Sequence, residues 1–477
     1  MNKSNQEYIQ IPDPILAKII KWKLELGLEV DKPIPIQNLT SIDILNAECL
    51  LIKDLSGIEH LTQLKQLNLY SNHKIQNIKP LAKLKQLRHL TLSENKIKDI
   101  TPLSGLTQLK LLWLDHNEIS DFTPIEKMTQ LKTLWLGGNP IQDLSHIYSL
   151  LKRFPLLISL SMNRLQISSV EPLAEFKKLT NLVIAKNRIC DITTLAELRQ
   201  LKHLYLSENR VSDIKPLANL SNLESLMLGN NEVNDISPLK GLTKCWDLSI
   251  MNNQVSDITP LAELKQLTHL NLGKNYIKDI TPLSNLSQLT RLTLVNNQIN
   301  DIKPLAKCSQ LTHLFLDNNQ IKDISPLKVL TLLNELRVKG LHITDISILH
   351  NFSKLKILSL DYNPIIDITP LFELTELWNL FLNGIEVNDL SQLSEFTQLT
   401  KLSIEGCNIS DITPLTSLVK LRELRIADNN IKDVNIIQNL PRLTSLSIKG
   451  NPIQDMTPIH KLSKQNQHFK LDIDIQD

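Results

Sequence analysis

One pattern recurs along nearly the whole chain and restarts every 22 residues. In the copy that begins at Leu267 it reads LTHLNLGKNYIKDITPLSNLSQ. Two insertions interrupt the period, one residue near His73 and four residues near Lys152–Pro155. A chain built from such units stacks them so that each contacts mainly its neighbours, which predicts one elongated domain. Nineteen copies begin at Ile42, Leu64, Leu87, Leu109, Leu131, Leu157, Leu179, Leu201, Leu223, Cys245, Leu267, Leu289, Leu311, Leu333, Leu355, Leu377, Leu399, Leu421 and Leu443.

The first half of each repeat predicts a short strand. Repeat positions 4 and 6, which are Leu270 and Leu272 in that copy, alternate with polar residues as in a half-buried strand. Stacked strands pair into a parallel sheet, with the alternate side chains facing outward. Position 9 is usually Asn, as at Asn275, and we expect its side chain to hydrogen-bond the buried backbone of the turn.

The second half of the repeat reads DI[ST]PLxxL and predicts a short helical turn. We expect the Ser or Thr hydroxyl before the proline to cap this turn, which is too short for a long helix. The complete template is the signature of a leucine-rich-repeat solenoid. The predicted fold is therefore an α/β solenoid, a leucine-rich-repeat horseshoe with a parallel sheet on its concave face and short 3₁₀ or helical turns on its convex face.

Non-repeating segments flank the repeats. We expect an N-terminal helical cap at residues 1–41, the nineteen repeats at residues 42–464, and a C-terminal cap strand and tail at residues 465–477. The cap helix is predicted to start with Asp13 as N-cap and to stop at Gly27. Its apolar face is predicted to contain Ile15, Ile19, Trp22 and Leu26. The cap strand is predicted from the alternation of Phe469, Leu471, Ile473 and Ile475.

The composition argues against several classes of partner. Lys and Arg number 52 and Asp and Glu number 50, so a net charge of +2 gives no reason to expect nucleic acid or an anionic membrane. No apolar stretch approaches the ~20 residues of a membrane span. The first residues lack the design of a secretory signal, so we expect a cytoplasmic protein; the alternative is export by a route without a cleavable N-terminal signal. The five cysteines are expected to be reduced and inert.

The repeat LxxLxLxxNxIxDIxPLxxLxx closely resembles that of bacterial internalins, and the same repeat class occurs in a regulatory subunit of protein phosphatase 1. The segment IPDPILAKIIKW and residues Leu39–Leu64 also look like the N-terminal cap and first repeat of these bacterial proteins. The match covers nearly the whole chain. It implies a binding scaffold.

Signatures of catalysis are absent from the sequence. It contains no GxxxxGK[ST] loop, no HExxH helix and no GxSxG elbow, so we expect neither an enzyme nor a cofactor. Four histidines occupy repeat position 3, and the closest two, His269 and His313, lie two strands apart. Their backbones are then about 9–10 Å apart, too far to share a metal ion without added ligands.

The outward positions of the sheet carry the candidate binding residues. Trp113 and Trp135 fall at position 5 of adjacent repeats, and exposed aromatics on a rigid sheet are typical of binding hot spots. The alternative is that aromatics here only stabilise the sheet, which we favour for Phe315. Mixed charges in the C-terminal third either pair along the sheet or form a second contact zone. The predicted partner-binding residues are Trp113, Trp135, Tyr205, Phe315, Arg337, Phe381 and Arg425.

These observations lead to one favoured function and two alternatives. We predict a monomeric, non-enzymatic scaffold that binds a protein partner on the concave face. One alternative is an exported internalin-like adhesin or effector that acts on another cell. The other is a regulatory subunit of an enzyme such as a phosphatase.

Overall fold

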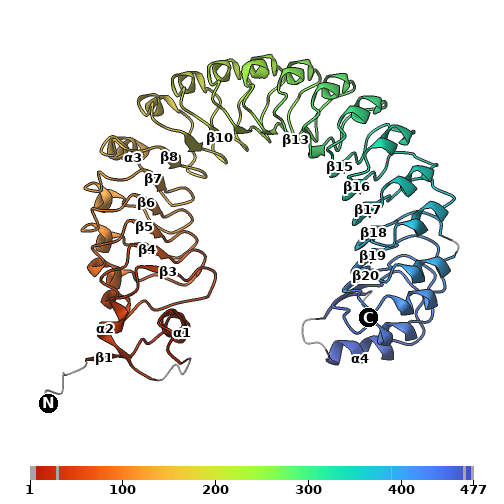
Figure 1. The fold of residues 1–477 in the computed structure, drawn as a ribbon, viewed down its shortest axis with the longest axis horizontal. Helices are drawn as coiled ribbons and strands as arrows, with labels where there is room; N and C mark the ends of the chain where they lie inside the picture. The colour runs from red at the N-terminus through yellow and green to blue at the C-terminus, as the bar shows by residue number, and fades with distance from the viewer. Residues whose placement is uncertain (1–6, 28–31, 388, 466–468, 474–477) are drawn as a thin grey trace. The chain divides into compact units, whose positions relative to one another are not determined.

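The computed structural model describes residues 7–27, 32–387, 389–465 and 469–473. The chain divides into two compact units, unit 1 at Met1–Asn231 and unit 2 at Glu232–Asp477. Each is a stack of repeats with three-residue strands on one side and short helices on the other (Figure 1). The predicted leucine-rich-repeat solenoid, with its parallel sheet and short 3₁₀ turns, is confirmed.

The strands of unit 1 occupy repeat positions 3–5 and run parallel. In the pair β6–β7, Leu112 lies opposite Leu134 and both are fully buried, because position 4 points into the core between the sheet and the helices. Positions 3 and 5 lie on the opposite side, which we call the strand face. The strands are β3 (Ile44–Asn46), β4 (Gln66–Asn68), β5 (His89–Thr91), β6 (Leu111–Trp113), β7 (Thr133–Trp135), β8 (Ser159–Ser161), β9 (Asn181–Val183), β10 (His203–Tyr205) and β11 (Ser225–Met227).

Short 3₁₀ helices follow most of these strands. The four-residue insertion lengthens one of them into an α-helix, α3 (Leu144–Leu151), which Asp143 caps through the amide of His146 at 3.1 Å. The 3₁₀ helices are η1 (Ile58–His60), η2 (Lys79–Lys83), η3 (Thr101–Leu103), η4 (Thr123–Ile125), η5 (Glu171–Glu175), η6 (Thr193–Glu197) and η7 (Lys215–Asn219).

Residues before the first repeat form β1 (Tyr8–Ile9), α1 (Pro14–Lys23), β2 (Ile34–Pro35) and α2 (Ile36–Leu39). Asp13 caps α1 as predicted: its Oδ1 accepts the amides of Ile15 and Leu16, while its Oδ2 accepts the amide of Lys53 in the first repeat. The predicted buried face was wrong. Trp22 is 69% exposed, and the buried positions are Leu16, Ala17, Ile20 and Lys21, so the buried face is rotated by about one residue from the predicted one. The helix also ends at Lys23, before Gly27.

Unit 2 repeats the same arrangement. Its strands are β12 (Asp247–Ser249), β13 (His269–Asn271), β14 (Arg291–Thr293), β15 (His313–Phe315), β16 (Glu335–Arg337), β17 (Ile357–Ser359), β18 (Asn379–Phe381), β19 (Lys401–Ser403), β20 (Glu423–Arg425), β21 (Ser445–Ser447) and β22 (Lys470–Asp472). Strand β22 pairs with β21 and places Leu471 opposite Leu446. Of the residues predicted for the cap strand, Ile475 lies outside the described residues.

The helices of unit 2 are almost all 3₁₀ helices. Those that follow the repeat strands are η8 (Ser237–Gly241), η9 (Thr259–Glu263), η10 (Thr281–Asn285), η11 (Lys303–Lys307), η12 (Ser325–Val329), η13 (Ser347–Asn351), η14 (Thr369–Glu373), η15 (Ser391–Glu395), η16 (Thr413–Ser417) and η17 (Asn435–Asn439). The last helix is α4 (Thr457–Gln465).

The asparagines at repeat position 9 bind buried backbone, as predicted. Asn117 donates to the carbonyls of Leu92 and Leu114 at 3.0 Å each, and its Oδ1 accepts the amide of Ile97 in the preceding repeat at 3.0 Å. At Leu165, Leu341 and Cys407, where position 9 is not Asn, the asparagine of the next repeat compensates. At Leu165, for example, Asn187 accepts two amides, those of Leu165 and Ile167.

The short helices are capped by a different residue from the one predicted. Thr101 is the first residue of η3, and its amide donates to Oδ1 of Asp99 at 2.8 Å. In other repeats the threonine hydroxyl also donates to the aspartate carboxylate, as Thr193 does to Oδ1 of Asp191 at 2.6 Å. The Asp of the DI[ST]P motif is therefore the cap, because its carboxylate reaches the amide two residues ahead.

Candidate partner-binding face

The two predicted anchor tryptophans stack on each other in unit 1. Trp113 and Trp135 are register partners on β6 and β7, and their ring centroids are 4.2 Å apart with an interplanar angle of 7°. Both side chains are half-buried on the strand face. The neighbouring position-5 residues, Thr91 and Ser161, are small and buried. The pair is therefore a bulky aromatic surface between two short side chains.

The two indole nitrogens differ in their partners. Nε1 of Trp135 donates to Oγ of Ser159 at 3.4 Å. Nε1 of Trp113 is buried and has no acceptor among the described residues. An unpaired buried donor of this kind costs about 1–3 kcal/mol.

Acidic residues lie at the carboxyl end of these strands. Asp115 follows β6, and burial raises the pKa of its carboxyl although the hydroxyl of Ser93 donates to it at 2.9 Å. Glu94 accepts the hydroxyls of Tyr70 at 2.9 Å and Ser71 at 3.1 Å. Both carboxylates are therefore already hydrogen-bonded within the chain.

Basic residues lie at the other end of the same strands. Arg88, Lys110 and Lys132 occupy repeat position 2, directly before β5, β6 and β7. None of the three forms an ion pair with a residue in the described ranges, whereas Lys65 in the preceding repeat pairs with Asp43 at 3.6 Å. This row was not predicted from the sequence, although the 22-residue period aligns its members.

Tyr205 lies apart from the tryptophan pair. It is half-buried on β10, opposite Val183 of β9 and Met227 of β11. Three strand-to-strand steps separate β10 from β7, so the structure does not bring Tyr205 against Trp135.

In unit 2 the candidate residues contact each other or their neighbours. Phe315 is 8% exposed and lies against two guanidinium groups, those of Arg291 at 5.2 Å and Arg337 at 5.5 Å from its ring centroid. Arg337 also forms an ion pair with Glu335, with Nη2 2.6 Å from Oε1. Both guanidinium groups thus interact with an aromatic ring of the same chain, and Arg337 also interacts with a carboxylate.

A second group of charged and aromatic residues in unit 2 is likewise paired within the chain. Lys401 lies 5.3 Å from the ring centroid of Phe381 and forms an ion pair with Glu423 at 2.9 Å. The same carboxylate pairs with Arg425 at 2.6 Å. These contacts show opposite charges pairing along the sheet, and whether the same residues also contact a partner stays a prediction.

Comparisons with known proteins agree with the repeat geometry. A family model described as leucine-rich repeats (2 copies) matches residues 85–127, 107–149, 199–241, 247–285, 287–329 and 419–460. An internalin of Listeria monocytogenes is 36% identical over 68% of this chain and 95% of its own, with a TM-score of 0.58. The chain belongs to the internalin-like bacterial leucine-rich-repeat proteins.

More distant structures share the fold alone. A leucine-rich-repeat protein of Leptospira interrogans is 21% identical, over 80% of this chain and 100% of its own, with a TM-score of 0.65. The ectodomain of a plant receptor kinase from Arabidopsis thaliana is 18% identical, over 88% and 66% of the two chains, with a TM-score of 0.53. A comparison with curated proteins gives no match. Leucine-rich-repeat domains generally mediate protein–protein interaction.

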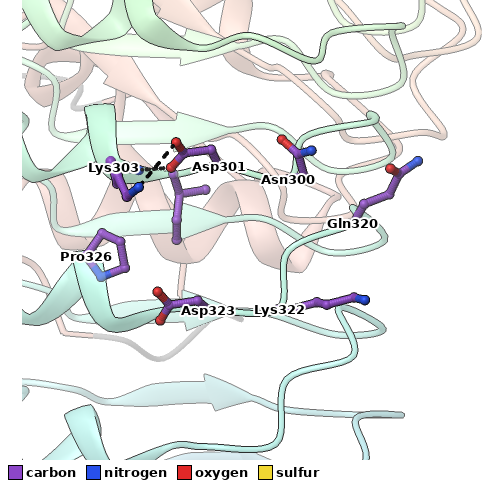
Figure 2. A pocket seen from close by; sticks show the side chains of 8 residues that line it. Asn300, Asp301, Lys303, Gln320, Lys322, Asp323 and Pro326 are labelled. Carbon is purple, nitrogen blue, oxygen red and sulfur yellow. Dashed lines mark hydrogen bonds and ion pairs between the residues drawn. The ribbon is translucent and has the colours of Figure 1, made fainter.

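In unit 2 of this internalin-like protein, one hollow is formed by the repeat itself. A hollow of about 610 Å³ in unit 2 lies between two loops that lead from strand to helix (Figure 2). Its acidic residues, Asp301 and Asp323, already accept the amides of Lys303 at 2.9 Å and Ser325 at 2.8 Å as helix caps. The hollow is therefore a feature of the repeat.

The cysteine thiols, possible metal ligands and possible membrane spans are the remaining candidates. Burial raises the pKa of the thiols of Cys245 to about 12 and of Cys308 and Cys407 to about 11, while Cys49 and Cys190 are exposed. In the ranges that the structure describes, no group of three or more His, Cys, Asp or Glu is placed to hold a metal ion. In those ranges, too, no helix combines the length and apolar character needed to cross a bilayer.

Proposed function

We propose that this internalin-like protein is a non-enzymatic scaffold that binds a protein partner on the strand face of unit 1, with Trp113 and Trp135 as its anchor. The observation that carries the proposal is the half-buried indole stack on a rigid sheet. Tryptophan is among the residues most enriched at binding hot spots, and a preformed stack loses little conformational entropy on binding.

The other predicted residues contribute less in this proposal. Tyr205 is a secondary contact in unit 1. Phe315, Arg337, Phe381 and Arg425 form a second contact zone in unit 2, where partner contacts would compete with stacking and ion pairs that exist within the chain. Displacing such contacts offsets part of any gain from binding.

The proposal places the protein in the cytoplasm as a monomer without a cofactor. One specific observation favours a second candidate, an exported adhesin or effector: the 36% identity to a Listeria internalin. Fractionation of the native cells separates the two. Protein in the medium or on the cell surface would favour export, and protein confined to the cytoplasm would exclude it.

Affinity capture tests the proposed anchor. The wild-type chain, a Trp113→Ala/Trp135→Ala variant and a matched Trp246→Ala/Trp378→Ala variant would each be incubated with lysate of the source cells, and captured proteins identified by mass spectrometry. The control also loses two tryptophans, which are 41% and 51% exposed at repeat position 2. We expect one partner to be captured by the wild type and the control but lost from the anchor variant. Identical captures by all three would contradict the proposed site.

A further inference from the structure

We propose that the strand face of unit 1 binds an extended, acidic segment of the partner protein, whose carboxylates pair with Arg88, Lys110 and Lys132 while its apolar side chains pack on Trp113 and Trp135. This inference rests on the proposed function, because it assumes the tryptophan anchor. It adds the chemical class of the partner segment and the direction in which that segment lies.

The three cations form a fixed row. The amide of Lys110 donates to the carbonyl of Arg88 at 2.8 Å, and the amide of Lys132 donates to that of Lys110 at 2.8 Å. The sheet ladder therefore continues through repeat position 2, and neighbouring members of the row lie about 4.8 Å apart at the backbone. Like charges held side by side on a sheet repel each other. An anionic occupant would remove that repulsion.

No carboxylate of the described residues neutralises this row. The position-3 residues beside it are His89, Leu111 and Thr133, none of which is acidic. The nearby carboxylates, Glu94 and Asp115, follow the strands at their opposite end. The strand face here is thus basic at one edge, aromatic in the middle and acidic at the other edge.

The spacing suits one extended chain. Positions 2 and 5 are three residues apart along a strand, or about 10 Å, and an extended segment projects alternate side chains to opposite sides. A segment lying across the strands, above the side chains of position 3, would direct acidic residues to the cation row. Its alternate, apolar residues would reach the indole pair.

A protein segment fits this surface better than single-stranded nucleic acid. Proteins that bind single-stranded nucleic acid stack its bases on aromatic faces. Here one face of each indole is already covered by the other indole, with ring centroids 4.2 Å apart. Preferential binding of an oligonucleotide is therefore an outcome that would contradict the inference.

A charged copolymer provides the test. The probe is a dye-labelled random copolymer of glutamate and tyrosine, and its binding to the full chain is followed by fluorescence anisotropy. Comparison probes are polyglutamate, a copolymer of lysine and tyrosine, and oligodeoxythymidylate. We expect the glutamate–tyrosine copolymer to bind most tightly and its affinity to fall as salt is added.

Charge variants identify the site. In the Arg88→Gln/Lys110→Gln/Lys132→Gln variant we expect Kd for the copolymer to rise by about tenfold at low ionic strength, the size expected for the loss of three exposed charge pairs. The matched control, Lys79→Gln/Lys83→Gln/Lys127→Gln, removes the same charge from the helix side of the same unit and should bind like the wild type.

Three results would overturn the inference. They are an unchanged affinity in the strand-face variant, a wild-type affinity that does not depend on salt, and tighter binding of the oligonucleotide than of the copolymer. If the strand-face variant binds normally but the Trp113→Ala/Trp135→Ala variant does not, the tryptophan anchor stands and only the acidic class of partner is wrong. If both variants bind like the wild type, the anchor is wrong as well.

Discussion

Aromatic and basic side chains lie on the strand face of both units, but they contact different partners. In unit 2, Phe315 lies against Arg291 and Arg337, and Phe381 lies against Lys401. In unit 1 the aromatic residues stack on each other, and the neighbouring cations have no ion pair among the described residues. The two units are built from the same repeat, but more of the strand-face cations in unit 2 are already paired within the chain.

The difference shows why residue type alone does not identify a binding surface. Arg337 and Arg425 occupy the same repeat position as Trp113, yet both are paired with glutamates two residues before them on the same strand. A paired cation must give up its carboxylate before it can bind another, whereas an unpaired one needs only to lose water. Whether a cation on the strand face can bind a partner therefore depends on the side chains beside it.

Replacing both tryptophans should have the largest effect. Each hot-spot tryptophan contributes about 2 kcal/mol or more to binding, so we expect Kd of the purified partner to rise by about a hundredfold or more in the Trp113→Ala/Trp135→Ala variant. Calorimetric titration measures it. A Phe315→Ala/Phe381→Ala variant should bind within about threefold of the wild type. An equal loss in both variants would remove the distinction between the units.

Phe315→Ala should instead lower stability. The ring is 8% exposed and is held between two guanidinium groups, so its removal leaves a gap and two unstacked cations. We expect a loss of about 2–3 kcal/mol in the free energy of unfolding, somewhat below that of a core phenylalanine. Chemical denaturation followed by circular dichroism measures it. An unchanged unfolding midpoint would show that Phe315 is not a structural residue.

Glu423→Gln should make unit 2 resemble unit 1. The substitution removes the carboxylate that pairs with Lys401 and Arg425 and leaves both cations unpaired. We expect a stability loss of about 0.5–1 kcal/mol, because these pairs are partly exposed. We also expect tighter binding of the glutamate–tyrosine copolymer than in the wild type. Unchanged copolymer binding would mean that unpaired cations alone do not create an acidic-segment site.

The smallest expected effect is a pH dependence. Burial raises the pKa of Asp115, so its charged form destabilises the fold, and wild-type stability rises as pH falls through this raised pKa towards the ordinary 3.8. Asp115→Asn should therefore be slightly more stable than the wild type at neutral pH, and the difference should vanish in acid. Thermal unfolding across pH measures it.

The helix caps should show the opposite trend. The hydroxyl and amide of Thr259 lower the pKa of Asp257, so the stability that this carboxylate contributes is present above 3.8 and is lost as pH falls through its lowered pKa. Asp257→Asn should destabilise the chain at neutral pH and less in acid. The same trend in both variants would contradict the assigned causes.

Much of the fold could be predicted because the repeat template fixes it. Leucine at position 4 and asparagine at position 9 each have one role that the stack allows, so the strands and the asparagine ladder followed from the sequence. The cap of the 3₁₀ helices did not, because the motif offers both Asp99 and Thr101 and only the turn geometry decides between them. The sequence of α1 offers two apolar faces, one residue apart. The face with Ile15 and Ile19 was predicted to be buried, but the structure buries the face with Leu16 and Ile20.

The site was less predictable than the fold. Register placed Trp113 beside Trp135, and the repeat period made that pair readable from the sequence. The pairing of Arg337 with Glu335, by contrast, depends on side-chain rotamers and on which neighbour is nearer. The row of Arg88, Lys110 and Lys132 could have been found by aligning position 2, but only the structure shows that no described carboxylate reaches it.

Hydroxyl-radical footprinting of the wild-type chain, with and without its captured partner, tests most directly that binding occurs on unit 1. Trp113 and Trp135 react readily when exposed, and Phe381 and Trp378 report on unit 2 in the same experiment. We predict that the partner protects Trp113 and Trp135 from oxidation much more strongly than Phe381 and Trp378. Protection of Phe381 and Trp378 with unchanged oxidation of the tryptophan pair would contradict this account.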